Sequence, residues 1–172
     1  HSFPTRRSSD LVPVSFVSNI TRWYSKNARD LPWRHATPWE VVVSEFMLQQ
    51  TPVNRVLPVY RQWVEKWPLP SALALEPVSE AVRAWGRLGY PRRAQRLHAT
   101  AVIIDRDFDD VVPSDEQNLR SLPGVGEYTA AAIAAFAFQA PTMVLDTNIR
   151  RVLSRHFEAK QWPSSSISTI NF

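Results

Sequence analysis

The stretch Leu122-Pro-Gly-Val-Gly-Glu-Tyr-Thr-Ala-Ala-Ala132 lies between two segments with helical periodicity. Two glycines one residue apart permit a tight turn with positive φ and let backbone N–H groups approach a ligand. An Ala-rich helix is expected to start just after Gly126, so its free N–H groups and dipole point toward the turn. The stretch is open to two interpretations: an anion site that suits a phosphate, or a plain helix–helix turn.

Helical signals fill most of the remaining chain, whereas alternating strand patterns are nearly absent. Thr37-Pro-Trp-Glu40 combines a capping box with Pro at the first helical position. A second capping box is expected at Pro113-Ser-Asp-Glu-Gln117. The sequence therefore predicts an all-α fold with short connections. The expected helices cover residues 37–50, 52–67, 71–75, 79–87, 91–108, 113–122, 127–138 and 146–157.

Composition narrows the possible functions. The 172 residues carry 20 Lys or Arg against 16 Asp or Glu, a net charge of +4, and no cysteine. Most basic residues are Arg, which favours phosphate contacts, although such a charge is also ordinary for soluble enzymes. The missing cysteine excludes disulfides, thiolate metal sites and Cys nucleophiles within the chain. With no membrane-length apolar run and no signal peptide, a cytoplasmic location is expected.

Four further segments occur in a fixed order along the chain. With the glycine turn, they resemble the adenine DNA glycosylase (MutY) family of the helix-hairpin-helix DNA glycosylase superfamily, over residues 21–157. Two positions depart from the family pattern: Pro91 stands where a second Tyr is usual, and Thr147 where Gly is usual. The four segments are Leu31-Pro-Trp-Arg34, Ser44-Glu-Phe-Met-Leu-Gln-Gln-Thr51, Gly86-Arg-Leu-Gly-Tyr90 and Val144-Leu-Asp-Thr-Asn-Ile-Arg-Arg-Val-Leu153.

The resemblance implies a base-excision-repair enzyme. It would hydrolyse the N-glycosidic bond of adenine paired with 8-oxoguanine or guanine, acting as a monomer on double-stranded DNA near the bacterial nucleoid. The complete family member is expected to hold a 4Fe-4S cluster through four cysteines that this chain lacks. No metal ligand is therefore assigned here.

The resemblance also implies a domain organisation. Residues 1–14 are expected to be disordered or non-native, and residues 15–36 to form an N-terminal helix of a second, cluster-bearing domain. A helical barrel would span 37–145, with the helix-hairpin-helix at 114–138. Residues 146–160 would begin the C-terminal helical part, and 161–172 would form an irregular tail of a truncated chain. The apolar faces of Trp23, Tyr24 and Val152 would then be partly uncovered.

Two carboxylates are the catalytic candidates, because breaking a purine N-glycosidic bond requires a protonated base and a stabilised cationic sugar. Glu45 lies on or beside an apolar helix face, where a carboxyl tends to stay protonated; otherwise it belongs to the polar side of its helix. Asp146 precedes a helix, where an N-cap is the common role. The resemblance makes Glu45 the general acid, Asp146 the stabiliser of the sugar and Asn148 its hydrogen-bonding support.

The residue at position 128 distinguishes glycosylases that also cleave the DNA strand from those that do not. Glycosylase/lyases related to endonuclease III carry a Lys at this position, which forms a Schiff base with the sugar. This chain has no Lys between Lys66 and Lys160. A monofunctional enzyme is therefore expected, although Tyr128 also fits a half-buried core position. The alternatives are an endonuclease-III-like glycosylase/lyase for oxidised pyrimidines and a non-enzymatic helix-hairpin-helix module that binds DNA.

The remaining candidates are expected to hold DNA or the extruded base, as the resemblance implies. Trp33 and Arg34 would hold the adenine, or simply pack at the surface. Two arginine clusters, on 92–96 and 150–155, suit phosphates or a solvated face equally well. The residues assigned to DNA binding are Gln49, Gln50, Thr51, Leu88, Tyr90, Leu122, Gly124, Val125 and Gly126.

Overall fold

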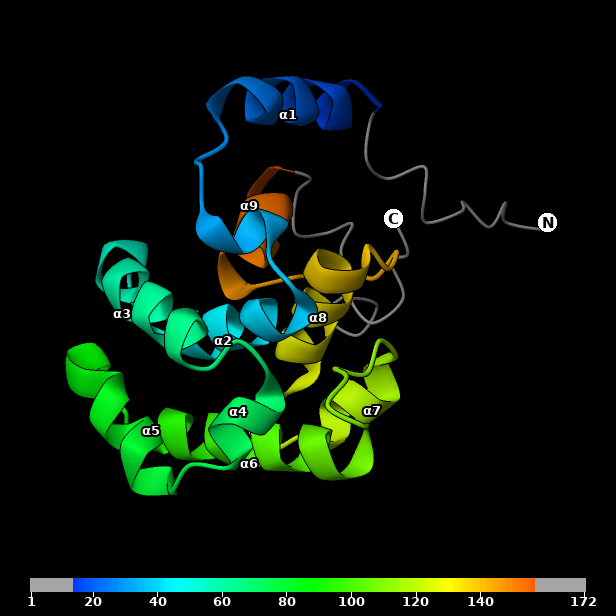
Figure 1. Ribbon diagram of the computed structural model, residues 1–172. Coiled ribbons are helices and arrows are strands. Elements are labelled where there is room, and N and C mark those ends of the chain that lie inside the picture. The colour runs from blue at the N-terminus through cyan, green and yellow to red at the C-terminus, as the bar shows by residue number, and fades with distance from the viewer. Residues whose placement is uncertain (1–13, 157–172) are drawn as a thin grey trace. The chain divides into compact units, whose positions relative to one another are not determined.

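The computed structural model describes residues 14–156, and 1–13 and 157–172 lie outside that part, with most of the end segments expected at 1–14 and 161–172. Within 14–156 the chain forms helices and connections and no strand, which confirms the all-α prediction (Figure 1). No helix in this part is long and apolar enough to cross a membrane. The order is α1 (Val14–Asn27), η2 (Pro32–His35), α2 (Pro38–Leu48), α3 (Val53–Lys66), α4 (Pro70–Ala74), α5 (Val78–Trp85), η3 (Gly86–Leu88), α6 (Arg92–Asp107), α7 (Glu116–Ser121), α8 (Glu127–Phe138) and α9 (Thr147–His156).

The chain divides into two compact units. The central unit comprises residues 32–144, and the described part of the terminal unit joins residues 14–31 to 145–156. In the terminal unit the Phe16 ring of α1 lies 4.7 Å from the His156 ring of α9. Apolar side chains of this unit remain open, with Trp23 63% and Val152 59% exposed. The two ends of the described chain thus meet in one unit that has little buried core of its own.

The core of the central unit is built around α2. Val42, Phe46 and Met47 are fully enclosed, and burying one such side chain stabilises a fold by roughly 1.5–3 kcal/mol. Helix α2 packs against α3, α6 and α8, while α6 also packs against α4 and α5 (Figure 1). The middle of α8, residues 129–134, is buried, and its alanines let the helix lie close to α2. The helix that carries Glu45 is therefore the most enclosed element of the unit.

Tryptophans fill the space between α3 and α5. The Trp63 ring meets Trp67 at 4.8 Å and Trp85 at 5.5 Å, both edge to face. The indole N–H of Trp39 donates to the Trp67 carbonyl at 3.0 Å, which ties the start of α2 to the end of α3. Edge-to-face pairs favour one relative orientation of the rings, so this cluster fixes how α3 and α5 sit on the core.

Helix starts follow the expected signals with one correction. The Thr37 hydroxyl accepts from the Glu40 N–H, and the Glu40 carboxylate accepts from the Thr37 N–H at 2.7 Å, so the first capping box is confirmed. The second helix expected from capping, at 113–122, is capped by Asp115 rather than by Ser114, since Asp115 accepts from the Asn118 N–H at 2.9 Å. Helix α7 is accordingly shorter than expected.

Candidate functional site

Glu45 lies in the second half of α2, between the buried residues Ser44 and Phe46. Burial raises the pKa of its carboxyl to about 7. The loss of water around a carboxylate disfavours the charged form, and no donor among residues 14–156 offsets that loss. The structure thus places a carboxylic acid with a near-neutral pKa among the buried residues of α2, which is typical of a general acid.

The helix-hairpin-helix is formed by α7, the turn 122–126 and α8. The Val125 N–H donates to the Leu122 carbonyl at 3.1 Å, which closes the turn. Gly124 has a φ of +84°, a conformation that costs any residue with a side chain roughly 1–2 kcal/mol. The side chains of Leu122 and Val125 point into the core. The turn therefore offers backbone groups, not these two side chains, to a ligand.

Gly126 forms the N-cap of α8. The first turn of any helix leaves backbone N–H groups without intrahelical partners, and together with the helix dipole they favour an anion. Glu127, at the first position of α8, and the exposed Tyr128 flank these groups. The hairpin and the start of α8 thus form a helix N-terminus of the kind that favours an anion.

The hairpin is held on the rest of the central unit by one hydrogen bond and by close packing around Gly124. The Thr100 hydroxyl of α6 donates to the Pro123 carbonyl at 2.9 Å. A Cβ added to Gly124 would lie 2.8 Å from Cδ of Arg96 and 3.1 Å from Cε1 of Phe46. A side chain at this position would therefore force Arg96 and Phe46 to shift, so packing as well as φ favours glycine here. The hairpin consequently rests directly on Phe46, the neighbour of Glu45 in the chain.

Two loops of the central unit, residues 49–51 and 88–90, each expose one side chain, which is called the tip of the loop. In the first, Gln50 is exposed with a φ of +55°, while Thr51 is buried. In the second, Tyr90 is 66% exposed with a φ of +50°. Leu88 is only 4% exposed and belongs to the core, because η3 turns its side chain inward. Its predicted contact with DNA can therefore involve its backbone but not its side chain.

Arg93 contradicts the expected phosphate role of its cluster. Its side chain is 6% exposed, whereas Arg92 and Arg96 on the same helix are exposed. Arg93 binds backbone and hydroxyl oxygens of both loops just described. Helical periodicity in the sequence does indicate this burial, because Arg93 precedes the core residues Leu97, Ala101 and Ile104 at steps of three and four. A helix position on the core-facing side predicts burial even for arginine.

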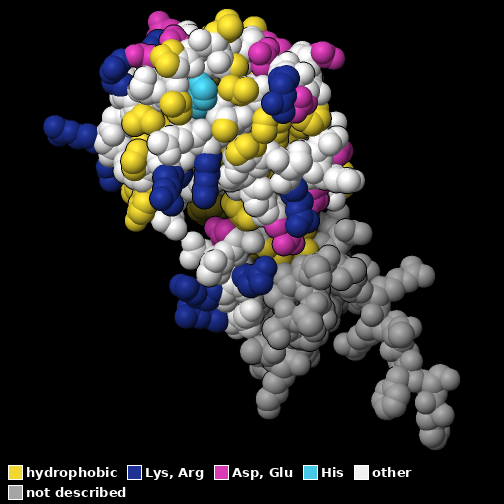
Figure 2. All heavy atoms as spheres, turned by 90° about the horizontal axis from the view of Figure 1, so that it is seen from below, with side chains coloured by type: hydrophobic (Ala, Val, Ile, Leu, Met, Phe, Trp, Pro, Cys, Tyr) yellow, Lys and Arg dark blue, Asp and Glu magenta, His cyan; other side chains and the backbone are white. Residues whose placement is uncertain are grey.

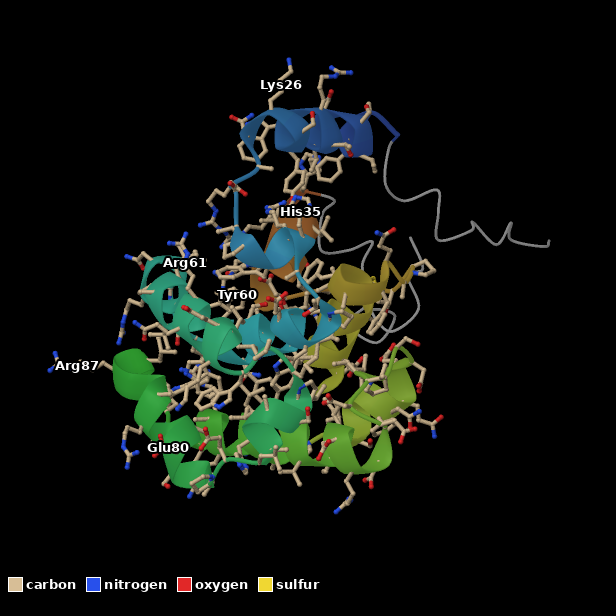
Figure 3. The ribbon with its side chains drawn as sticks, viewed as in Figure 1. Lys26, His35, Tyr60, Arg61, Glu80 and Arg87 are labelled. Carbon is tan, nitrogen blue, oxygen red and sulfur yellow. The ribbon has the colours of Figure 1, made fainter. Side chains whose placement is uncertain are left out.

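The pair Trp33–Arg34 lies on η2. The Trp33 ring meets Tyr60 of α3 edge to face at 5.2 Å, and Tyr60 lies between α3 and η2 (Figure 3). Burial and the nearby Glu40 raise the pKa of the Tyr60 hydroxyl above its usual range. Arg34 is exposed. One edge of Trp33 is thus held by the core.

Asp146 and Asn148 belong to the terminal unit. The Asp146 carboxylate accepts from the Ile149 N–H at 2.6 Å, as an N-cap of α9 does. Asn148 is exposed on the first turn of that helix. Both residues therefore sit at the N-terminal end of a helix, which carries the positive pole of the helix dipole.

Neither the basic side chains on the face shown in Figure 2 nor the possible metal ligands of residues 14–156 form a concentrated site. On the face shown in Figure 2, Lys and Arg side chains are spread apart rather than gathered in one patch. No group of three His, Cys, Asp or Glu side chains within residues 14–156 is placed to hold a metal ion. The sequence has no cysteine, so the residues present do not fit an iron–sulfur cluster.

Comparison with known proteins identifies the family. A model described as "HhH-GPD superfamily base excision DNA repair protein" matches residues 43–170. The adenine DNA glycosylase of Mycolicibacterium smegmatis is 54% identical over 147 residues, which cover 84% of this chain and 49% of that protein. This chain accordingly spans about half the length of that relative. The resemblance to adenine DNA glycosylases seen in the motifs is confirmed by this identity.

Solved structures show the same fold. A thermostable thymine-DNA glycosylase superposes with a TM-score of 0.77 and 30% identity, over 81% of this chain and 65% of that chain. A non-covalent endonuclease III–DNA complex superposes with a TM-score of 0.70 and 21% identity, over 88% of this chain and 77% of that chain. The fold, the hairpin and the matched segment agree, and the chain belongs to the HhH-GPD superfamily of base excision DNA repair proteins.

Proposed function

We propose that the protein carrying this chain is a monofunctional DNA glycosylase that removes adenine paired with 8-oxoguanine or guanine. The observation that carries the proposal is Glu45, a carboxylic acid with a pKa of about 7 on the buried helix α2. It lies in the segment Ser44–Thr51, which resembles the adenine glycosylase motif. The 54% identity to an adenine DNA glycosylase supports adenine as the base.

In the proposed reaction Glu45 supplies a proton to the adenine ring. The C1′–N9 bond then breaks, its electron pair leaves with the base, and positive charge develops on the sugar. A pKa near 7 keeps much of the acid protonated at neutral pH and still allows it to give the proton up. Water adds to C1′ and loses a proton, which leaves an abasic site and free adenine.

Asp146 is proposed to stabilise the cationic sugar. Its carboxylate is held rigidly by the Ile149 N–H, so it need not reorganise when charge develops. Asn148 would support it through a hydrogen bond. Tyr128 stands where a lyase would have an amine and is proposed to pack against the substrate without attacking it.

Double-stranded DNA is the proposed partner, bound by a single protein molecule. The backbone of Gly124 and Gly126 would take a phosphate at the start of α8. The loops 49–51 and 88–90 would enter the base stack as adenine is extruded, and Trp33 with Arg34 would hold the extruded base. A backbone phosphate site gives affinity without sequence preference, which suits an enzyme that searches for mispairs.

The test is base release from a panel of duplexes by the full-length protein. Strands carrying adenine opposite 8-oxoguanine, adenine opposite guanine, thymine opposite guanine and an oxidised pyrimidine are incubated in single-turnover excess of protein. Free adenine from the first two is expected. Release of thymine, which the likeness to a thymine-DNA glycosylase makes the sharpest competitor, or of the oxidised pyrimidine without adenine would contradict the proposal.

A second measurement separates the monofunctional enzyme from a lyase. The adenine strand is expected to stay intact until alkali cleaves the abasic site. Borohydride is expected to trap no adduct, because the sequence has Tyr128 at the lyase position and no Lys between Lys66 and Lys160. Nicking without alkali together with a trapped adduct would assign the lyase chemistry instead. If no base is released from any duplex while DNA is still bound, the non-enzymatic module is the better description.

A further inference from the structure

Arg93 is a buried cation in the first turn of α6. Its guanidinium lies 5.2 Å from the Trp85 ring and 5.6 Å from the Tyr90 ring. Burial lowers its pKa, so the surroundings must compensate the charge. They do so with oxygen atoms rather than with an acid, since no carboxylate is paired with it among residues 14–156.

The oxygen atoms come from two separate segments. Nη1 donates to carbonyls of residues 46, 47 and 49, and Nη2 donates both to the Thr51 hydroxyl and to the carbonyls of residues 88 and 89. One planar fork therefore bridges two segments that lie about 40 positions apart in the chain. The acceptors are the carbonyls of Phe46 at 3.2 Å, Met47 at 3.1 Å and Gln49, the Thr51 hydroxyl at 2.9 Å, and the carbonyls of Leu88 at 3.3 Å and Gly89 at 3.0 Å.

The two bridged segments share an unusual feature. Each contains a non-glycine residue with positive φ, Gln50 at +55° and Tyr90 at +50°, and both side chains are exposed. Such a conformation costs about 1–3 kcal/mol and persists only where the surroundings impose it. Arg93 contacts the residues immediately before both tips, so it supplies part of that constraint. Lysine has no planar fork and could not bridge both segments in the same way.

We propose that Arg93 is a positioning residue that fixes the separation of the loops 49–51 and 88–90, so that Gln50 and Tyr90 enter a DNA duplex together. The inference rests on the proposed function, since it assigns a purpose to this spacing during base extrusion. Arg93 itself remains buried and touches no substrate. It acts indirectly, by holding the backbone next to Gln50 and Tyr90 in place.

The variant Arg93→Lys tests this in the full-length protein, with Arg92→Lys as the matched control on the exposed neighbouring position. Three quantities are measured: affinity for an undamaged duplex, extrusion reported by 2-aminopurine beside the mispaired adenine, and single-turnover release of adenine. Misplacing reacting groups by about 1 Å can cost on the order of 10²-fold in rate. Arg93→Lys is expected to lose at least about tenfold in extrusion and release while undamaged-duplex affinity stays within about threefold. Arg92→Lys should retain extrusion per bound complex.

A measurement without DNA, amide hydrogen exchange, tests the role of Arg93 independently of the proposed glycosylase function. Amide hydrogen exchange in 49–51 and 88–90 is expected to accelerate together in Arg93→Lys, while exchange in the hairpin 122–126 stays unchanged. If the parent releases no adenine, the proposed function fails and the exchange result still decides the role of Arg93. Unchanged exchange in both loops, or extrusion equal to the parent, overturns the positioning role.

A milder variant covers the case in which Arg93→Lys does not fold. Thr51→Val removes one acceptor of Arg93 at nearly constant volume. It is expected to lower extrusion by about threefold to fivefold, since one hydrogen bond to a charged group is lost, without a matching loss of affinity for undamaged DNA. Loss of extrusion only in proportion to the unfolded fraction, in either variant, would make Arg93 merely a structural residue.

Discussion

The two catalytic candidates occupy opposite kinds of environment. Glu45 lies on the buried helix α2 with no hydrogen-bond donor among residues 14–156, and burial raises its pKa to about 7. Asp146 lies at the exposed start of α9 and accepts the Ile149 N–H at 2.6 Å. The first environment disfavours the charged form of the carboxyl, whereas in the second a backbone hydrogen bond fixes the position of the carboxylate. The same functional group is thus prepared for two tasks by its position on a helix, in the middle or at the N-terminus.

The largest expected effect comes from Glu45→Gln. Glutamine preserves shape but cannot donate the acidic proton, so single-turnover adenine release should fall by about 10²–10⁴-fold, with DNA affinity retained. Glu40→Gln is the matched control on the same helix, because Gln also completes a capping box. A Glu45→Gln rate within about threefold of the parent would remove Glu45 from the acid role.

Asp146→Asn separates charge from capping. Asn caps a helix about as well as Asp, so the unfolding midpoint should hardly change, while loss of the charge beside the cationic sugar should slow release by about 10²-fold. Asp146→Ala should lose the same activity and also about 1 kcal/mol of stability. If Asp146→Asn keeps full activity and only Asp146→Ala is impaired, Asp146 is a cap and nothing more.

Stability offers a second way to distinguish the carboxylates. The folded pKa of Glu45 lies above its unfolded value of 4.5, so the folded state binds more protons between these values and loses stability as pH rises from about 4.5 to 7. Glu45→Gln removes this penalty and should be more stable than the parent by roughly 2–3 kcal/mol at pH 8. The difference should vanish near pH 4, as denaturant unfolding at both pH values would reveal. A less stable Glu45→Gln at pH 8 would mean that the carboxylate has an unrecognised partner.

The pH dependence of the reaction follows from the same shift. Because the protonated form of Glu45 acts as the acid, adenine release should be nearly constant below pH 6 and fall about tenfold per unit well above pH 7. The small residual rate of Glu45→Gln should lack this step. A parent rate that rises through pH 7 would indicate that Glu45 acts as a base.

Local features were the ones the sequence could predict. Thr37 and Glu40 cap α2 as expected, and the glycine turn joins α7 to α8, because each signal depends only on neighbouring residues. The N-cap of α7 moved from Ser114 to Asp115, since two adjacent capping residues compete and the carboxylate accepts from the Asn118 N–H. Roles that depend on residue chemistry, such as those of Glu45 and Asp146, were proposed from motifs.

Features that depend on contacts between distant segments were not predicted. Arg93 was grouped with its exposed neighbours, although the oxygens that bury it come from positions 46–51 and 88–89. Leu88 was assigned to DNA, yet its side chain joins the core. The dependence of Gly124 on Arg96 and Phe46 likewise arises only when three elements meet. Helical periodicity carried back from Leu97 predicts the burial of Arg93 but not its partners.

The alanines of α8 have a mechanical consequence. Side chains at 130–134 are enclosed on all sides, and short side chains give a helix no flexible layer through which to roll or slide. The hairpin at its start is therefore held at a fixed angle. Double-stranded DNA, in contrast, yields readily at weakly stacked steps. When the hairpin binds DNA, we expect the duplex to deform rather than the hairpin. A mispair that weakens base stacking would then be bent at a lower free-energy cost than intact DNA.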